Sequence, residues 1–582
     1  MPAFLAWQNR PAWCVLDTAF DDGHHFLSTW QKWLCDSQHS RMLHYVAVCG
    51  QAPNRASVQR ALQAFPALQP HADTLTRQWF GLLPGFHRIV LGDGQVLLTL
   101  CVGDLKAMLR EQRFTADTVL LGPSDTTHWA LKAVARCCRR GTVLVTHGLN
   151  DTTREPLHDV LAALGFELQV QAGQMHGHFN PRWDLSNSRG GRPDLSAVAA
   201  TPTSCVVIGA GLAGASVAAA LARRGWRVQV LDAAPTPAAG ASGLPAGLAV
   251  PHTSPDNSPR SRLSRAGLRL TLEQARFMLV SGHDYEACGT LERRLDGKLG
   301  LPADWPQAGN DWSADATDPA TGAALWHPHA AWIKPAQLIA AWLKQPGVNW
   351  VPNTKVNRLT PTPEGWVISG AAGQLLATAP LVVVAAAGQS LVLLKSTRDD
   401  GSASLSPTLK PGFGRVDSLH ELAGQVSWGL HQPGDAAVFP DVPVNGSGSF
   451  IPAVPTPVGP AWFAGATYEA LGAAGRHPLS QTTQHSDNLN KLEALLPSTA
   501  ARLKPRYQHH SVQAWSGVRC ATSDRLPVVD AMAVGESPGL WVSAALGSRG
   551  LSLCVLCAEL LAARLHAEPL PVEKRLARLL SA

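Results

Sequence analysis

The sequence has no apolar run long enough to cross a membrane, and its charges are few and nearly balanced. The most apolar run, Leu381–Ala387, has the length of a strand, whereas a membrane-spanning helix needs about 20 residues. Charged residues make up 16% of the 582, with 49 Lys and Arg against 43 Asp and Glu, a net charge of +6. The small excess is spread along the chain. It argues against a polybasic nucleic-acid face of the histone or ribosomal kind and leaves room for a local basic groove.

Cysteine and histidine spacings indicate neither a disulfide framework nor a metal site. The 11 cysteines are scattered, which suits a reducing compartment. Cys554 and Cys557 form a Cys-x-x-Cys without a second pair, and we interpret them as part of a buried helix face. His24–His25 and His176–His178 lack a third ligand. The first residues show no basic segment followed by an apolar one, so we expect no signal peptide and a cytoplasmic protein without a membrane or a metal.

The length and a hydrophobic content of 45% predict two large globular domains rather than one core. A stretch rich in Ser, Gly, Pro and Ala, residues 186–203, has no periodicity and is interpreted as a linker. We therefore predict one domain over residues 1–185 and a second over residues 204–582.

Both domains are predicted to be α/β. The first alternates apolar runs with helical stretches, which is typical of a doubly wound, Rossmann-type sheet with its ligand at the carboxyl ends of the strands. Its candidate strands are Trp13–Leu16, Leu43–Val48, Val96–Leu100, Thr118–Leu121 and Thr142–Thr146, and its candidate helices include Arg55–Ala64 and Thr127–Arg136. The second opens with a βαβ unit and continues with strands at Trp366–Ser369, Leu381–Ala385 and Ala461–Ala464 and helices at Pro335–Lys344 and Leu551–Leu565.

The strongest signal is a dinucleotide-binding fingerprint at the start of the second domain. Gly209-x-Gly211-x-x-Gly214 follows the strand-like run Cys205–Ile208, opens an Ala-rich helix and precedes a second strand that ends at Asp232. The glycines allow a tight turn, close approach to a pyrophosphate and packing of helix on strand, while the helix N-terminus faces the phosphate. We expect Asp232 to accept hydrogen bonds from ribose hydroxyls.

Three further small-residue loops favour FAD over NAD. Gly240, Ser242 and Gly247 follow the second strand, where a loop of small residues can lie against an extended FAD. Gly388 ends a later strand that we expect to close over the adenine side. Gly547 and Gly550 open the last long helix, whose N-terminus could point at the flavin pyrimidine ring and stabilise its anionic reduced form.

These elements and their order resemble the D-amino-acid oxidase/glycine oxidase flavoproteins. More closely, the chain resembles the bifunctional tRNA 5-methylaminomethyl-2-thiouridine biosynthesis (MnmC) family, which has a methyltransferase-like domain first and a flavin domain second. The blocks that carry the resemblance, over roughly residues 204–570, are Gly240-Ala-Ser-Gly, Gly424-Gln-Val-Ser, Gly465-Ala-Thr-Tyr468, Gly517-Val-Arg519-Cys-Ala-Thr-Ser-Asp524-Arg-Leu-Pro527 and Ala545-Leu-Gly-Ser-Arg549-Gly.

The resemblance implies an FAD-dependent oxidation of a tRNA wobble nucleoside. The family's flavin domain removes the carboxymethyl group of 5-carboxymethylaminomethyl-2-thiouridine and leaves the 5-aminomethyl form. Arg519 matches the arginine that binds the substrate carboxylate in the glycine-oxidase group, and a guanidinium suits that task because its planar fork can bind both oxygens. Arg549 is a candidate substrate or flavin contact. Tyr468 is a weaker candidate, with a buried core tyrosine as its alternative interpretation.

The first domain departs from the family at three ligand-binding elements. The family's S-adenosylmethionine loop, Gly-Phe-Gly-Thr-Gly-x-Asn-Phe, reads Ala19-Phe-Asp21-Asp-Gly-His-His-Phe26 here. The acidic residue that holds the ribose falls at Cys49, and the aspartate of the catalytic loop falls at Gly122, in Leu121–Trp129. We therefore expect the fold to be kept, S-adenosylmethionine binding to be compromised and the methyltransferase activity to be lost.

Several functional hypotheses remain open. The main one is an FAD-dependent tRNA oxidoreductase. The others are a fully bifunctional oxidoreductase and methyltransferase, an oxidase of free N-substituted glycines, and a non-catalytic RNA-binding protein that retains FAD. The basic clusters at Arg260–Arg269, Arg139–Arg140 and Lys504–Arg506 could bind phosphates, but most such runs are solvated, so the tRNA prediction rests on the family resemblance.

Overall fold

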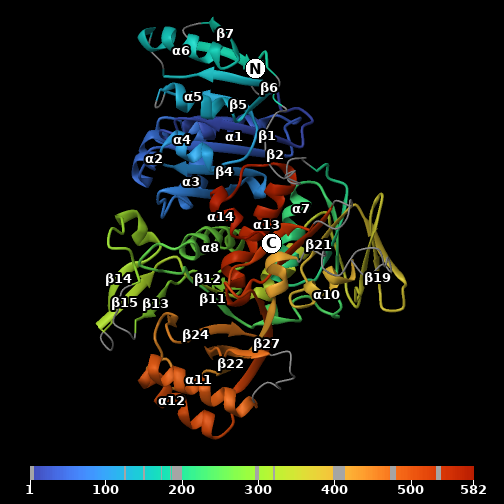
Figure 1. Cartoon of the computed structure of the whole chain (residues 1–582). Helices are drawn as coiled ribbons and strands as arrows, with labels where there is room; N and C mark the ends of the chain where they lie inside the picture. The colour runs from blue at the N-terminus through green and yellow to red at the C-terminus, as the bar shows by residue number, and fades with distance from the viewer. Residues whose placement is uncertain are drawn as a thin grey trace. The chain divides into compact units, whose positions relative to one another are not determined.

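The computed structural model describes residues 6–123, 126–148, 151–171, 174–183, 185, 200–294, 300–318, 322–397, 413–471, 480–532 and 539–582. The chain forms two compact units (Figure 1). The first comprises Met1–Thr201 and Ala562–Arg578, and the second comprises Pro202–Leu561 and Leu579–Ala582. Residues 186–199 of the predicted linker lie outside the described residues. The sequence placed all of 204–582 in one domain, whereas residues 562–578 pack with the first unit.

The first unit is built on an eight-stranded sheet, drawn in blue and cyan in Figure 1. Its five central strands are parallel, and antiparallel strands complete both edges. The central strands are the five that the sequence predicts. In spatial order the strands are β3 (Gly85–Leu91), β4 (Val96–Val102), β2 (Met42–Cys49), β1 (Ala12–Asp17), β5 (Ala116–Leu121), β6 (Cys138–Thr146), β8 (Gln174–Phe179) and β7 (Phe166–Gln171).

Helices cover both faces of this sheet, which confirms the doubly wound prediction. Successive side chains of a strand point to opposite faces. Val15 belongs to the core with α1 (His24–Cys35), α2 (Arg55–Gln63) and α3 (Gln69–Arg77), whereas Leu16 belongs to the core with α4 (Leu105–Arg110), α5 (His128–Ala135) and α6 (Asp151–Ala163). The central strands are apolar in continuous runs because both of their faces are buried.

The segment Ala562–Arg578, which includes α14 (Lys574–Arg578), is held to the first unit by buried hydrogen bonds. The Gln112 side chain donates to the Leu570 carbonyl at 3.0 Å and accepts from the Leu570 N–H at 2.9 Å. The buried Arg88 guanidinium donates to the Pro569 carbonyl at 2.5 Å. These partners are more than 450 positions apart, so local sequence patterns could not predict this pairing.

The second unit contains a six-stranded sheet with β9 (Ser204–Ile208) and β21 (Leu381–Val384) at its centre. All its strands are parallel except the edge strand β28. Helix α7 (Leu212–Arg223) connects β9 to β10, and α13 (Gly550–His566) follows β29. The other strands are β17 (Val348–Val351), β10 (Arg227–Leu231), β29 (Leu540–Ala544) and β28 (Val528–Ala531).

A large mixed sheet of nine described strands forms the rest of the core of this unit, as the glycine-oxidase-like fold prediction requires. Helices α11 (Gln481–Leu495) and α12 (Pro497–Gln508) share an apolar core with it. Its strands are β14 (Ala314–Asp318), β15 (Gly322–His327), β13 (Thr290–Arg293), β23 (Val444–Asn445), β24 (Ser449–Thr456), β25 (Gly459–Gly465), β22 (His420–Leu430), β26 (Glu469–Leu471) and β27 (Gln513–Ala521).

Two small sheets and three helices complete the second unit. The sheets are β11 (Gly247–Ala249), β16 (Ala331–Ile333) and β12 (Tyr285–Glu286), and β18 (Arg358–Thr362), β19 (Gly365–Ser369) and β20 (Leu375–Ala379). The helices are α8 (Pro259–Met278), α9 (Pro335–Leu343) and α10 (Gln389–Ser396). In the described part of the chain no helix combines the length and the apolar character that a membrane span requires.

Candidate active site

The glycine fingerprint forms a tight turn between β9 and α7. Gly209 has φ of 109°, a backbone conformation that favours glycine, and a Cβ there would lie 2.6 Å from the Ala385 carbonyl oxygen. A Cβ on Gly214 would lie 1.8 Å from the Gly209 carbonyl oxygen, so only glycine lets the first turn of α7 pack on the strand end. Gly211 immediately precedes α7 and leaves the helix N-terminus open to a ligand phosphate.

Asp232 lies directly after β10 and is tied to this turn. Its Oδ2 accepts a hydrogen bond from the Ala210 N–H at 2.6 Å, and its Oδ1 accepts one from the Ala234 N–H at 2.8 Å. A carboxylate can accept about four hydrogen bonds, so both oxygens keep capacity for ribose hydroxyls. The position of Asp232 therefore suits the adenosine end of a dinucleotide.

A cavity of about 820 Å³ runs from this turn through the second unit. It is lined by Gly209, Gly211, Asp232, Gly240, Ser242, Gly247, Gly547, Gly550 and all three candidate catalytic residues. Gly214 and Gly388 are not among its lining residues, although Ala387 and Gln389 are. Gly388 instead faces Glu421, because a Cβ there would lie 2.2 Å from the Glu421 Oε1.

The small-residue loop after β10 packs against the helix that receives the phosphate. Ser242 lies in a 3-10 turn (Ala241–Gly243), and its Oγ accepts a hydrogen bond from the Leu212 N–H at 3.1 Å. At Gly240 a Cβ would meet nothing within 4 Å, so the space beside this loop is open to a ligand.

Gly547, with φ of 56°, starts the 3-10 turn Gly547–Arg549 that leads into α13.

At its other end the cavity gathers cationic and aromatic side chains. The Arg519 guanidinium, from β27, lies 4.6 Å from the centre of the Tyr468 ring. Its Nη1 is buried and has no hydrogen-bond partner among the residues that the structure describes. Lys491, from α11, also lines the cavity; its Nζ donates to the Ala466 carbonyl at 2.7 Å and lies 5.6 Å from the Tyr468 ring centre. Tyr468 is 57% exposed, so the interpretation as a buried core tyrosine is wrong.

Arg549 lines the same cavity from the turn before α13. Burial lowers the pKa of its guanidinium from the usual value, and the charge of Arg260 acts in the same direction. Both effects favour an added negative charge beside it, because such a charge offsets the cost of burying a cation. Arg519, Arg549 and Lys491 together make this end of the cavity a site for an anion.

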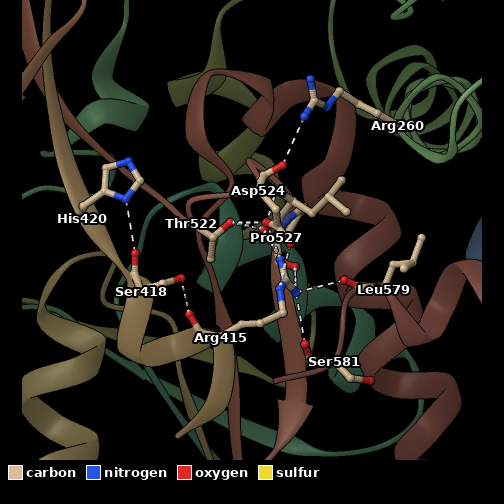
Figure 2. A network of polar contacts seen from close by, with 10 residues as sticks. Arg260, Arg415, Ser418, His420, Thr522, Asp524, Pro527, Leu579 and Ser581 are labelled. Carbon is tan, nitrogen blue, oxygen red and sulfur yellow. Dashed lines mark hydrogen bonds and ion pairs between the residues drawn. The ribbon is translucent and has the colours of Figure 1, made fainter.

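An ion-pair network anchors the loop that follows β27 (Figure 2). Arg415 forms a bidentate pair with Asp524, at 3.0 Å from Nε to Oδ2 and 2.8 Å from Nη2 to Oδ1. Its Nη1 donates to the carbonyls of Pro527, Leu579 and Ser581 at 2.9–3.1 Å, and Arg260 donates to the Asp524 carbonyl. Because this loop continues the strand that carries Arg519, the network holds the end of β27 in place.

Sequence reasoning missed Lys491 and Arg415. Lys491 is one lysine on the surface of an amphipathic helix, and only its tertiary contact with Tyr468 distinguishes it. Arg415 lies 109 positions before its partner Asp524. The conspicuous motif block around Asp524 was the one available signal that this loop has a structural partner.

The second unit matches a known family model. Residues 204–564 match the model of the FAD dependent oxidoreductase family. The structure of glycine oxidase from Geobacillus kaustophilus is similar over 66% of this chain and 98% of its own, at 18% identity and a TM-score of 0.47.

Curated relatives match nearly the whole chain. The tRNA 5-methylaminomethyl-2-thiouridine biosynthesis bifunctional protein MnmC of Polaromonas sp. strain JS666 is 46% identical over 99% of this chain and 91% of its own length. The protein of the same name from Polaromonas naphthalenivorans is 44% identical over 98% and 90%. The chain belongs to this MnmC family, and its second unit belongs to the FAD-dependent oxidoreductases.

Proposed function

We propose that this chain binds FAD in the cavity of the second unit and oxidises 5-carboxymethylaminomethyl-2-thiouridine at the tRNA wobble position to the 5-aminomethyl form. One observation carries the proposal: Arg519 lines a dinucleotide-sized cavity, and one of its nitrogens is buried without a hydrogen-bond partner among the described residues. The nucleoside to be oxidised is an N-substituted glycine, so it brings the carboxylate that such a guanidinium binds.

The residues of the cavity fit FAD. The open loop at Gly240 and the N-terminus of α7 beside it suit the pyrophosphate, and Asp232 suits the adenosine ribose. The turn Gly547–Arg549 and the N-terminus of α13 lie on the same cavity, where their backbone N–H groups can stabilise negative charge on a reduced flavin. When bound, FAD accepts a hydride from a carbon adjacent to an amine.

Arg519 would bind both oxygens of the substrate carboxylate and so fix the methylene carbon between carboxylate and nitrogen. Tyr468 supports the guanidinium from one side, and Lys491 and Arg549 add positive charge around it. This role is orientation and electrostatics, which suffices if the amine arrives neutral.

The reaction balances with water as the second reactant. With FAD bound, the methylene carbon would give up a hydride to it, and the nitrogen lone pair would form a protonated imine with that carbon. Water then adds to the imine carbon, and the C–N bond breaks to give glyoxylate and the primary 5-aminomethyl group. The protein positions the carboxylate throughout, so the released two-carbon acid leaves from the Arg519 end.

The tRNA substrate is inferred from the relatives, whose names describe tRNA 5-methylaminomethyl-2-thiouridine biosynthesis. The exposure of the anion site supports it. Tyr468 and Val518, which line the cavity, are 57% and 42% exposed, so a nucleotide carried by a macromolecule can reach this end. An oxidase of free glycine derivatives would need no such exposed entrance.

The experiment is a conversion assay with the purified flavin-loaded full chain. Wobble-modified tRNA is incubated with the enzyme in air, digested to nucleosides and analysed by mass spectrometry, while glyoxylate is trapped as a hydrazone. We expect the 5-aminomethyl nucleoside and glyoxylate in equal amounts. Unchanged tRNA, together with glyoxylate from free N-methylglycine, would show instead an oxidase of small amines.

A further inference from the structure

We infer that the first unit has no S-adenosylmethionine site and that the chain therefore releases its tRNA product as an unmethylated primary amine. The second half of this inference rests on the function proposed above. In a doubly wound sheet the ligand site is at the carboxyl ends of the strands. The residues that follow β1, β2, β5 and β6 decide whether this edge of the sheet can hold the methyl donor.

The loop after β1 carries side chains where close backbone approach would be needed. Ala19 is 4% exposed, and its Cβ lies 2.3 Å from the point that a Cβ on Gly122 would occupy. The same point is 3.0 Å from the His147 ring. Ala19 and His147 thus occupy the space into which a side chain at position 122 would project. An aspartate at position 122 is incompatible with the alanine at position 19.

Among the described residues of this edge, aromatic and imidazole rings pack together beside Ala19. Phe20, 3% exposed, stacks on Trp79 with ring centres 5.6 Å apart, and His25 packs on His147 at 4.4 Å. Behind them the buried Asp17 carboxylate accepts hydrogen bonds from the Tyr45 hydroxyl at 2.7 Å and the Ala19 N–H at 3.0 Å. These contacts pack the described residues around the end of β1 tightly together.

The polar groups that would recognise the ligand are also committed or absent. At the start of α1 the Asp22 carboxylate accepts a hydrogen bond from the His24 N–H at 2.9 Å. An internal carboxylate therefore already lies at this helix N-terminus, and a second anion there would be repelled. Cys49, at the end of β2, is buried with its pKa raised to about 12, so a neutral thiol stands where a carboxylate would bind ribose.

A consequence follows for the reaction sequence. Methylation would replace one N–H of the 5-aminomethyl group with N–CH₃ and would convert a bound sulfonium donor to its thioether. Without a donor site, this step does not occur on the chain. Any methylated product must come from a separate N-methyltransferase that accepts the primary amine on tRNA.

The binding test uses the full flavin-loaded chain and a tRNA that already carries the 5-aminomethyl group, so it does not depend on the flavin reaction. We measure equilibrium dialysis of tritium-labelled S-adenosylmethionine up to about 1 mM, a concentration that detects even weak binding, and transfer of label to the tRNA. We expect no saturable binding and no transfer. Saturable binding at one molecule per chain, or label in the nucleoside, would overturn the inference. If instead the flavin reaction fails while these results hold, only the proposed function is lost.

A second measurement tests the packed edge directly through thermal unfolding. Gly122→Ala is expected to lower the unfolding temperature of the wild-type chain, because its methyl group meets that of Ala19. In an Ala19→Gly background most of this loss should disappear. The control Gly141→Ala lies at a glycine with open space around it and should show the same shift in both backgrounds. Equal shifts for Gly122→Ala in both backgrounds would contradict the packing that the inference requires.

Discussion

Replacement of Arg519 by methionine removes the guanidinium and keeps an unbranched apolar side chain against Tyr468. In the proposed complex the fork makes two charge-assisted hydrogen bonds to the substrate carboxylate, each worth about 1.5–3 kcal/mol. Within the described part of the chain one of its nitrogens, Nη1, has no hydrogen-bond partner to lose, so most of the effect should appear in the reaction with substrate. A loss of about 3–4 kcal/mol corresponds to about 10²–10³-fold in kcat/KM. Arg519→Lys keeps the charge without the fork and should lose less activity.

The assay is the initial rate of glyoxylate formation from modified tRNA over a range of tRNA concentrations. The control is Arg276→Met, which removes an exposed arginine near the end of α8 that does not line the cavity. In Arg519→Met the flavin content and the unfolding temperature should stay close to wild type. The cation–π contact with Tyr468 that this variant loses contributes only about 0.5–1 kcal/mol at an exposed site. An Arg519→Met enzyme within a factor of about three of wild type, a difference below 1 kcal/mol, would refute the carboxylate role.

Three further predictions concern the cofactor, the second cation and the fold. Gly214→Ala places a methyl group 1.8 Å from the Gly209 carbonyl oxygen and should yield protein without flavin, whereas Gly240→Ala, at an open position, should retain the flavin. The ratio of flavin to protein absorbance measures the flavin content of both variants. Equal ratios in the two variants would contradict the assigned turn. Lys491→Met should lower kcat/KM by about 10-fold or more, since one charge-assisted hydrogen bond is worth about 1.5–3 kcal/mol; an unchanged value would remove Lys491 from the anion site. Burial alone would raise the pKa of Asp435, but hydrogen bonds from Arg506, the Gln432 N–H and Arg502 hold it below its usual value. Its stabilising contribution is therefore present above pH about 4 and is lost as the pH falls through the folded-state pKa. Asp435→Asn should cost about 3–5 kcal/mol of unfolding free energy at pH 7 and much less at acid pH in urea titrations, and a pH-independent cost would contradict the ion pair.

Local patterns predicted most of the two sheets. The apolar runs of β1, β2, β4, β5 and β6 mark strands buried on both faces, and the glycine fingerprint fixed β9, α7 and β10 together. The edge strands β3 and β7, and β8 beside β7, were missed because strands at and near a sheet edge carry weaker apolar patterns. Their order in the sheet depends on antiparallel pairings that no short segment encodes.

The candidate site likewise contains residues that local patterns predict and residues that only the fold brings together. Gly209, Gly211 and Asp232 could be located because backbone geometry demands those residue types at that spacing. Lys491 and Arg415 contact partners on other elements. These partners are far away along the chain, and only the fold brings them close. Because Gly388 follows β21, we expected it on the cofactor cavity. Ala387 and Gln389 line the cavity, whereas Gly388 packs against Glu421.

The most direct test of the central claim is the anaerobic single-turnover bleaching of the flavin absorbance. The purified enzyme is mixed in a stopped-flow instrument either with tRNA carrying 5-carboxymethylaminomethyl-2-thiouridine or with free N-methylglycine. We expect rapid and complete bleaching by the modified tRNA, little by the small amine, and loss of the tRNA signal in Arg519→Met. Bleaching by N-methylglycine with none by the tRNA would contradict the central claim.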